Sequence, residues 1–366
     1  MKRSPNLKMK SVFVALSGGV DSAVSALLLK QAGYIVTGVF MKNWSGEEFG
    51  ISNDCPWKRD QRDAASVCKH LNIPFKTYNF EKEYREEVIT YFFDSYRRGE
   101  TPNPDILCNQ HIKFGHFLDK AMAEGADMIA TGHYAQIGEG TDSHPFLQRA
   151  ADSNKDQTYF LYRLTKEQLS RTLFPIGHLT KSKVRKIAEK QRLPVAKKKD
   201  SQGICFVGKV NLREFLSQEL LEKKGKIIDI DTGHEVGTHS GAWFYTNGQR
   251  EGLRIGGSIK PYFVAGKNVG DNIVYVAKGK DNPHLYSRTL SLRDAHWINN
   301  PSANSTSLIG IVRYRQIPVP CIIHENIIIF DAPVWKPTIG QSVVLFNENE
   351  VLGGGIIDKI EDQTGK

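Results

Sequence analysis

The sequence predicts an α/β protein in which a doubly wound parallel sheet is followed by a small central domain and a C-terminal β-barrel. Three observations support this fold class. Apolar strand patterns alternate with helical patterns as far as Thr131, glycines recur between Gly225 and Gly257, and the segments after Asn272 are short and rich in β-branched residues. Strands that alternate with helices are typical of a parallel sheet. Many short strands with turns between them are typical of a barrel.

The first half of the chain begins with a strand, a helix and a second strand. A short apolar run at 12–16 predicts the first strand, and helical spacing at 20–31, ended by Gly33, predicts the helix. A buried strand at 35–40 completes this unit. The alternation continues with helices at 58–70, 81–98 and 109–124 and with strands at 75–79 and 128–131. We expect these strands to be parallel, with helices on both faces of the sheet.

The second half has a different character. After Thr165 the chain is helical and basic, and beyond Leu221 the helical spacing is lost. Segments with strand character lie at 273–277, 308–315, 322–330 and 342–346, with turns at Gly279, 281–283 and Pro337. We therefore expect three domains: an α/β domain at 1–210, a central domain at 211–275 and a barrel at 276–366.

Charge and hydropathy restrict the class of protein. The 366 residues include 49 Lys and Arg against 40 Asp and Glu, a formal net charge of +9. This surplus favours a polyanionic partner, although an ordinary basic protein has the same surplus. No apolar run approaches the roughly 18 residues that cross a bilayer, and the run at 12–16 is too short for the core of a signal peptide. We therefore expect a cytoplasmic protein that does not enter a membrane.

A glycine loop with the sequence Ser17-Gly18-Gly19-Val20-Asp21-Ser22 follows the first strand and opens the first helix. At such a junction, backbone N–H groups and the helix dipole face phosphate oxygens. The loop lacks the Gly-Lys-Ser/Thr of a Walker loop and the spacing of the dinucleotide fingerprint. We therefore predict a phosphate site of another type, where Ser17 and Ser22 add donors and Asp21 holds Mg²⁺. A purely structural turn is the weaker alternative.

Five cysteines stand at positions 55, 68, 108, 205 and 321, and no two form a Cys-x-x-Cys pair, so a zinc ribbon is not predicted. Cys108 follows a segment with two prolines and precedes a helix, whose dipole favours a thiolate. Cys205 follows three lysines, which also favour a thiolate. These two are candidate nucleophiles. Cys68 and Cys321 have the setting of small buried side chains, and Cys55 stays undecided.

Eight motifs occur in order along almost the whole chain. They are A-L-S-G-G-V-D-S at 15–22, F-M-K-N-W at 40–44, T-P-N-P-D-I-L-C-N-Q-H-I-K-F at 101–114, A-T-G-H-Y at 130–134, D-S-N-K-D-Q at 152–157, S-Q-G-I-C-F at 201–206, R-Y-R-Q at 313–316 and L-G-G-G at 352–355. Together they resemble the bacterial tRNA-specific 2-thiouridylases, a family of the Rossmann-like ATP-pyrophosphatase-loop superfamily.

The resemblance implies that the first domain is catalytic and uses ATP. Enzymes of this class split ATP between the α and β phosphates and transfer AMP to a carbonyl oxygen of the substrate. The implied contacts to ATP, with the loop at the phosphates and the last two residues beside the adenosine, are Ala15, Leu16, Ser17, Gly18, Gly19, Val20, Asp21, Ser22, Met41 and Gly132. Mg²⁺ would bind at Asp21.

The same resemblance assigns roles to the two thiols. Asn103, Pro104 and Asp105 would meet the wobble uridine of tRNA, which puts Cys108 beside that base. Cys205 would carry a persulfide received from a sulfur-relay protein, and Cys108 would assist release of its terminal sulfur, with a transient disulfide between them. The 2-carbonyl oxygen of uridine is a poor leaving group, so its adenylation lets sulfur displace AMP. Asp105 would act as an acid or base, or only as a turn-forming residue.

Further contacts to tRNA are implied in the first domain and in the barrel. They are His133, Lys155, Asp156, Gln157, Tyr314, Arg315 and Gln341. A uridine turned out of its stack can lie on aromatic side chains while arginines hold phosphates. Without the resemblance, each of these positions would be interpreted as an ordinary polar residue. The resemblance implies that the central and barrel domains contact tRNA.

Two other functions stay open on the sequence. A ligase of the same loop class would adenylate RNA or a small molecule, react it with ammonia or an amine, and need no thiol pair. A nucleotide-regulated RNA-binding protein would not convert ATP to AMP. Serine in place of Cys108 and Cys205 distinguishes the ligase from the thiouridylase, and AMP formation that depends on tRNA excludes the binding protein.

Overall fold

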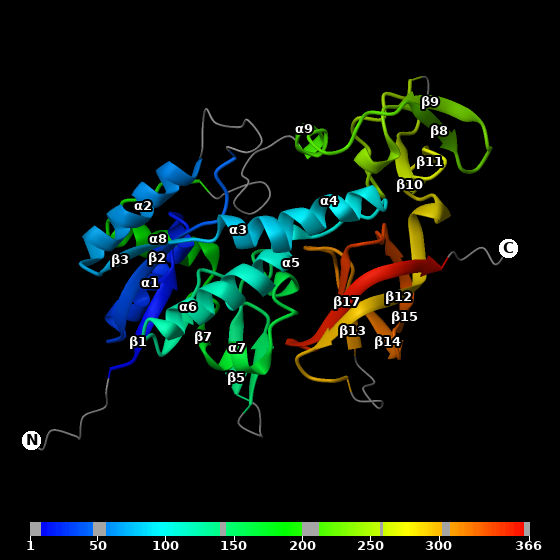
Figure 1. Ribbon diagram of the computed structural model, residues 1–366. Coiled ribbons are helices and arrows are strands. Elements are labelled where there is room, and N and C mark those ends of the chain that lie inside the picture. The colour runs from blue at the N-terminus through cyan, green and yellow to red at the C-terminus, as the bar shows by residue number, and fades with distance from the viewer. Residues whose placement is uncertain are drawn as a thin grey trace, which may run out of the picture. The chain divides into compact units, whose positions relative to one another are not determined.

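The computed structural model describes residues 9–46, 56–139, 144–199, 212–256, 259–301 and 308–361. The chain divides into two compact units, whose elements are labelled in Figure 1. The first consists of Met1–Glu87 and Asp105–Lys209, and the second of Val88–Pro104 and Val210–Lys366. The second unit therefore includes a short segment from the first half of the chain.

A parallel sheet of five strands, in the order β3-β2-β1-β4-β7, forms the centre of the first unit. Its strands, paired in parallel throughout, are β1 (Ser11–Ala15), β2 (Ile35–Lys42), β3 (Phe75–Asn79), β4 (Met128–Ala130) and β7 (Thr172–Leu173). The strand order reverses at β1, because β2 lies on one side of it and β4 on the other. Open α/β sheets bind ligands at the carboxyl ends of strands at such a switch point. The predicted doubly wound sheet is confirmed.

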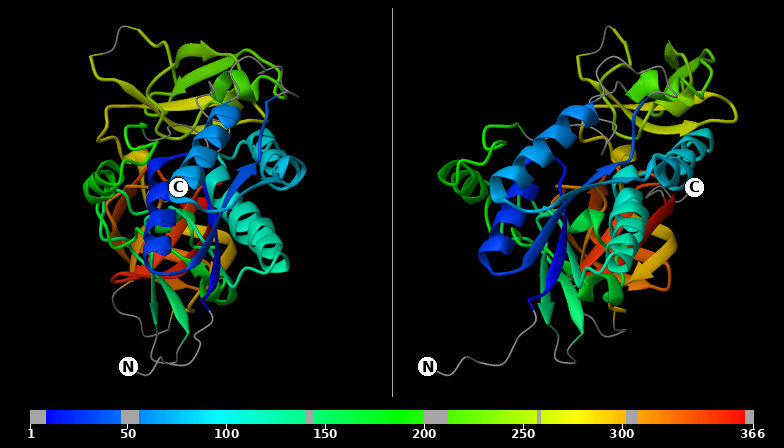
Figure 2. Two further views of the ribbon diagram at one scale, coloured as in Figure 1. Left: turned by 90° about the vertical axis from the view of Figure 1, so that its left-hand side faces the viewer. Right: turned by 60° about the vertical axis from the view of Figure 1, so that its left-hand side comes forward.

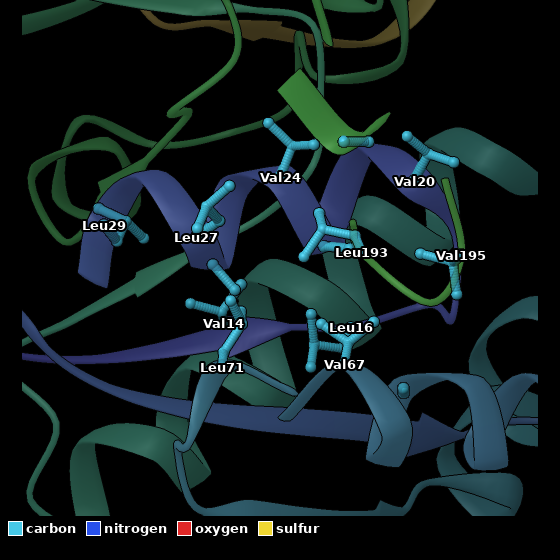
Figure 3. Packing of buried hydrophobic residues seen from close by; sticks show 14 of the residues in the cluster. Val14, Leu16, Val20, Val24, Leu27, Leu29, Val67, Leu71, Leu193 and Val195 are labelled. Carbon is cyan, nitrogen blue, oxygen red and sulfur yellow. The ribbon is translucent and has the colours of Figure 1, made fainter. Parts of the chain in front are cut away.

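Three helices pack together around one side of β1: α1 (Val20–Gln31), α2 (Pro56–Leu71) and α8 (Lys181–Lys190). Figure 3 shows the valines and leucines that pack between these elements. They include Val14 of β1 and Leu16 directly after it, Val20, Val24, Leu27 and Leu29 of α1, Val67 and Leu71 of α2, and Leu193 and Val195 after α8. Full burial of such a side chain stabilises a fold by about 1.5–3 kcal/mol. This core therefore fixes the start of α1 against the end of β1.

Two longer helical segments contain π-helical turns. The first runs through α3 (Glu81–Tyr84), the π-helix η2 (Arg85–Ile89) and α4 (Thr90–Arg97), close to the predicted helix at 81–98. The second runs through α5 (Pro104–Leu107), the π-helix η3 (Cys108–His116) and α6 (Phe117–Ala123). The predicted start at 109 was wrong, because the helix begins at Pro104. Proline suits the first position of a helix, since the N–H that it lacks would have no partner within the helix there.

The rest of the first unit is an antiparallel hairpin and short helices. The hairpin pairs β5 (Gln136–Glu139) with β6 (Pro145–Gln148). The 3₁₀-helix η4 (Thr158–Phe160) and α7 (Lys166–Ser170) follow it. A capping box between Thr165 and Gln168 begins α7, which satisfies two backbone donors at that end.

The second unit contains a mixed four-stranded sheet in the order β10-β11-β8-β9. Its strands are β8 (Gly225–Asp229), β9 (Glu235–His239), β10 (Tyr262–Asn268) and β11 (Ile273–Lys278). Two short helices, α9 (Leu212–Leu216) and η5 (Ala242–Phe244), belong to the same part. Phe215 of α9 packs on Phe92 and Phe93 of α4, with ring centroids 5.8 and 5.1 Å away. These contacts explain why a segment of the first half belongs to this unit.

A closed antiparallel barrel completes the second unit, as predicted, and its orange and red strands are visible in Figure 2. After η6 (Pro283–Leu285), its strands are β12 (Tyr286–Trp297), β13 (Leu308–Ile311), β14 (Val319–His324), β15 (Ile327–Trp335), β16 (Ser342–Asn347) and β17 (Glu350–Glu361). The pairing of β12 with β17 closes it.

Two strand predictions in the barrel were wrong. The segment 322–330 is a hairpin, because β14 ends at His324 and β15 begins at Ile327. Glu325 makes this turn with a positive φ of 53°. The predicted strand at 308–315 ends at Ile311. The three-domain division at 1–210, 211–275 and 276–366 stays a prediction, and the two compact units differ from it by placing Val88–Pro104 with the later residues.

Candidate functional site

The glycine loop makes the tight turn between β1 and α1 at the switch point of the sheet. Gly18 has a φ of +72°, a region that favours glycine. A Cβ atom at Gly18 would lie 2.3 Å from the carbonyl oxygen of Asp60 in α2. Glycine is therefore required here both by the backbone conformation and by the close approach of α2.

Hydroxyl groups hold the shape of this loop. Ser17 N donates to Ser22 Oγ at 3.2 Å, and Ser22 Oγ donates to the carbonyl of Gly19 at 3.2 Å. Gly19 is the N-cap of α1, and no side chain caps the helix there. The first N–H groups of a helix lack partners within the helix and carry its positive dipole. The start of α1 therefore fits an anion.

The two predicted adenosine contacts lie next to the loop. A Cβ atom at Gly132, which follows β4, would lie 2.6 Å from Ser22 N. Leu16 N donates to Val39 O of β2 at 2.8 Å, and Met41 follows two residues later on the same strand, 5% exposed. The loop, Gly132 and Met41 thus come together at the carboxyl ends of three neighbouring strands.

Asp21 is held by two side chains that the sequence did not point to. Lys181 Nζ donates to both of its carboxylate oxygens at 2.8 Å, and Tyr134 Oη donates to Oδ1 at 2.8 Å. Lys181 is the first residue of α8, in the stretch after Thr165 that the sequence marked only as helical and basic. The one sequence signal for Tyr134 was its place in the motif 130–134.

The motif at 152–157 connects this pair to the rest of the unit. Asp152 Oδ2 accepts from Lys181 N at 2.8 Å, at the start of α8. Gln157 Oε1 accepts from Tyr134 N at 3.0 Å. Asp156 is 8% exposed and accepts from Arg149 Nε at 2.8 Å. Two of the three predicted tRNA contacts here, Asp156 and Gln157, therefore also hold the fold, whereas Lys155 is half-buried.

Magnesium fits this site only together with a phosphate chain. Across the described ranges, no group of three or more His, Cys, Asp or Glu side chains is arranged to hold a metal ion. Mg²⁺ in nucleotide sites commonly takes one or two carboxylates and completes its shell with phosphate oxygens and water. Asp21 supplies one such carboxylate at the start of α1.

Cys108 is fully buried, with 0% of its surface exposed. It is the first residue of the π-helix η3, one turn after Asp105, which lies half-buried in the first turn of α5. Because the helix begins at Pro104, Cys108 is not at its N-terminus, where the dipole acts most strongly. π-helical turns are rare and often occur at functional sites. Asn103, directly before the helix, is also half-buried.

The other cysteines fall into two groups. Burial raises the pKa of the Cys68 thiol to about 11 and that of Cys321 to about 12. Both are buried, so they have the properties of small apolar side chains and not of nucleophiles. Cys55 and the predicted nucleophile Cys205 lie outside the described residues.

His133 lies inside the first unit. It is 9% exposed, its ring is 5.8 Å from that of Phe114 and 6.2 Å from that of Phe174, and Nδ1 is 2.8 Å from Thr131 Oγ1. Burial, with a smaller contribution from Lys113, holds the pKa of His133 well below its usual value. The imidazole is therefore neutral.

The remaining predicted contacts lie in the second unit. Arg315 is exposed, with a φ of +64°, and its guanidinium lies 5.0 Å from the centre of the half-buried Tyr314 ring. Gln341 Nε2 donates to Thr101 O at 2.8 Å and to Pro102 O at 3.1 Å. Gln341 therefore holds the chain directly before Asn103.

Asn43 is a further candidate that the sequence alone did not single out. It follows β2 and is 2% exposed, and within the described part of the chain neither polar atom of its amide has a hydrogen-bond partner. Its only sequence signal was its place in the motif 40–44.

In the described part of the chain, no helix combines the length and apolar character of a membrane span.

A parallel sheet with a glycine loop at its switch point, and an open helix terminus beside that loop, defines a nucleotide-binding α/β enzyme. Family models of a tRNA methyl transferase HUP domain, a tRNA methyl transferase PRC-barrel domain and an aminomethyltransferase beta-barrel domain match residues 10–209, 213–278 and 287–357. These matches cover most of the chain in the predicted order of architectures.

Curated relatives identify the family more narrowly. The tRNA-specific 2-thiouridylase MnmA of Nitrosomonas eutropha is 51% identical over 356 residues, covering 94% of this chain and 98% of that protein. The protein of the same name from Pediococcus pentosaceus is 48% identical over 359 residues, covering 95% of this chain and 94% of its own length. The chain belongs to the family of tRNA-specific 2-thiouridylases. A solved 4-thiouridine synthetase in complex with RNA and ATP is only distantly similar, with 17% identity and a TM-score of 0.33 over 57% of this chain and 50% of that one.

Proposed function

We propose that this chain catalyses the ATP-dependent 2-thiolation of the wobble uridine of tRNA, in the cytoplasm. The observation that carries the proposal is the open phosphate site at the start of α1, in a chain that is 51% identical to a named tRNA-specific 2-thiouridylase. A transferase of this kind needs a site that activates an oxygen and a thiol that delivers sulfur. The first unit contains the loop and Cys108.

The glycine loop supports the activation step. ATP supplies the adenylyl group that turns the 2-carbonyl oxygen of uridine into a leaving group. Ser17 to Ser22 would hold its phosphates, Met41 and Gly132 would flank its adenosine, and Asp21 would hold Mg²⁺ against the phosphates. Lys181 and Tyr134 keep the Asp21 carboxylate in position. AMP and pyrophosphate are the products.

Sulfur transfer requires both thiols. In our proposal a sulfur-relay protein delivers a persulfide to Cys205, and its outer sulfur becomes the sulfur of the base when AMP leaves. Cys108 breaks the sulfur–sulfur bond, which leaves a Cys108–Cys205 disulfide that an external dithiol reduces again. Asp105, one helical turn from Cys108, would act as the acid or base.

Several surfaces would contact tRNA. Asn103, Pro104 and Asp105 would meet the target base, and the exposed Arg315 with Tyr314 would contact the backbone. Lys155, Asp156, Gln157, His133 and Gln341 complete the proposed contacts. Because His133 and Asp156 are buried, these two would act by shaping the surface. The central part and the barrel of the second unit are the domains proposed to contact tRNA.

The test of this function is the release of AMP from ATP by the purified chain supplied with a persulfide donor and a dithiol, with and without unmodified tRNA. We expect AMP only when tRNA is present. Asp21→Ala should abolish AMP formation and leave tRNA affinity nearly unchanged, whereas the exposed Asp119→Ala is the matched control and should keep activity. AMP formation without any need for tRNA, or unchanged AMP formation by Asp21→Ala, would contradict the proposal.

A further inference from the structure

Asn43 lies at the carboxyl end of β2 with a buried and unsatisfied side chain. It is 2% exposed, and within the described ranges its amide oxygen and nitrogen both lack a hydrogen-bond partner. The amide of asparagine has an acceptor and a donor to satisfy. Buried polar groups are nearly always paired, so an amide with both groups unmet indicates a partner that arrives later.

A second buried asparagine, Asn272, is an example in this chain of an amide with a structural role. Asn272 is 4% exposed. Its Oδ1 accepts from Ala242 N at 3.0 Å, and its Nδ2 donates to the carbonyls of Lys223 and Lys224, each at 3.0 Å. Among the described residues, neither Oδ1 nor Nδ2 of Asn43 makes a hydrogen bond.

The position of Asn43 is beside the candidate nucleotide site. Phe80 N donates to Lys42 O at 2.9 Å, so the ladder between β2 and β3 continues to the residue before Asn43. Side chains two residues apart on an extended chain point to the same face, which puts Asn43 on the side of Met41. Lys42, between them, is paired with Glu81 at 2.6 Å.

An occupant that satisfies Asn43 must offer a donor and an acceptor side by side. Phosphate oxygens only accept, so a phosphate would leave Oδ1 of the amide without a donor. The edge of adenine offers both, because its 6-amino group donates and the adjacent ring nitrogen accepts. Asparagine recognises adenine in nucleic acids through this pair of groups.

We propose that Asn43 binds the adenine of ATP, with Oδ1 accepting from the 6-amino group and Nδ2 donating to the adjacent ring nitrogen. The inference rests on the proposed function, because it takes ATP as the nucleotide. It adds a residue that recognises the base to the loop that holds the phosphates. Uridine also offers a donor beside an acceptor, so the target base is the competing occupant that the experiment separates.

The first measurement is the melting temperature of the ligand-free protein. Asn43→Leu replaces an unsatisfied amide with an apolar side chain of similar size, so Tm should stay the same or rise. Asn272→Leu is the matched control and should lower Tm, because it leaves three backbone groups unpaired. If Asn43→Leu lowers Tm as much as the control does, Asn43 is structural and the inference is wrong.

The second measurement is equilibrium binding of ATP and of purine riboside triphosphate, which lacks the 6-amino group. The wild-type protein should bind ATP about tenfold more tightly than the analogue, within the range of an amide–adenine pair. Asn43→Leu should bind ATP about tenfold more weakly and should no longer distinguish the two triphosphates. Its affinity for tRNA should not change.

Three results of the binding measurements would also overturn the inference. Equal affinity of the wild-type protein for the two triphosphates does so without any variant. Weaker tRNA binding by Asn43→Leu with ATP binding intact would assign the amide to the target uridine. A wild-type protein that binds no ATP would reject the proposed function itself, which distinguishes that failure from the other two.

Discussion

Lys181 keeps Asp21 in one position before any ligand binds. Its ammonium donates to both carboxylate oxygens at 2.8 Å, and the side chains of Lys181 and Asp21 are 13% and 31% exposed. Asp152 fixes the other end of this contact by accepting from Lys181 N. The position of the candidate metal ligand thus depends on a residue of α8.

Lys181→Met should lower tRNA-dependent AMP formation by about tenfold or more, because hydrogen bonds to a charged group contribute about 1.5–3 kcal/mol. The measurement is the rate of AMP release at saturating ATP and tRNA, with a persulfide donor and a dithiol present. Lys190→Met, which removes an exposed charge from the same helix, should keep the wild-type rate. Equal rates for the two variants would contradict this role of Lys181.

His133 should make stability depend on pH. Its pKa is held well below the usual 6.5 in the folded protein, so below about pH 6.5 the unfolded chain binds a proton that the folded chain does not. The stability that neutral His133 preserves is therefore complete above that pH and is lost as pH falls, by up to about 1.4 kcal/mol per pH unit.

Urea unfolding at about pH 7.5 and about pH 5.5 measures this effect. The wild-type protein should lose more stability between the two pH values than His133→Gln, whose side chain does not titrate. Other histidines contribute equally to both proteins and cancel. The same loss in both proteins would show that His133 is protonated in the folded state.

Among single residues, contacts between chain neighbours could be predicted from the sequence, and contacts between distant residues could not. The loop at 17–22 was predictable because its residues are neighbours and their turn follows from the chain itself. Lys181 reaches Asp21 across 160 positions, and no pattern in the sequence encodes that contact. Asn43 was missed for a similar reason, since burial without a partner exists only after the chain has folded.

Among the elements, the turn between β1 and α1 depends most on glycine. At Gly18 the positive φ and the carbonyl of Asp60, 2.3 Å from a Cβ, act together. Gly125 has a φ of +88° with nothing within 4 Å of a Cβ. A comparison of alanine substitutions at Gly18 and Gly125 therefore separates the cost of backbone strain from the cost of the clash with α2.

Gly125→Ala should destabilise the protein by roughly 1 kcal/mol, the cost of alanine at positive φ. Gly18→Ala should cost clearly more, because α2 must also move, and it should weaken ATP binding. Tm and ATP affinity measure the two effects. Equal destabilisation by both substitutions would mean that α2 does not restrict the loop.

Element boundaries were predicted best where the signals were local. The strand at 75–79 and the helix at 20–31 match β3 and α1 to the residue. The second long helix starts earlier than predicted because Pro104 begins it. The π-helical turns could not be predicted, since they depend on packing and not on apolar spacing.

The whole molecule carries a net charge of +9, so binding to tRNA should weaken steeply as salt rises. Arg315→Ala should lower the slope of log K against log salt by about 0.9 for a duplex-like contact. Arg288→Ala makes the same charge change at another exposed position of the barrel and should leave the slope unchanged. Affinity that does not respond to salt would mean that the surplus charge serves another purpose.

The order of architectures was predictable from alternation in the first half and short strands in the second. The membership of Val88–Pro104 in the second unit was not, because it depends on contacts with residues far along the chain. Arg293 Nη2 donates to Glu100 Oε2 at 2.8 Å, and Thr101 N donates to Ile339 O at 2.9 Å. Dividing the sequence into consecutive segments therefore cannot identify a unit that combines two separate stretches of the chain.

The proposed reaction delivers sulfur to tRNA through Cys205 and Cys108. Its most direct test is the amount of 2-thiouridine in tRNA, measured by mass spectrometry after reaction with ATP and a persulfide donor carrying labelled sulfur. Wild-type protein and the control Cys321→Ala should form it. Cys108→Ser should accept label on Cys205 without passing it on, and Cys205→Ser should form no 2-thiouridine. Normal thiolation by Cys205→Ser would contradict the account.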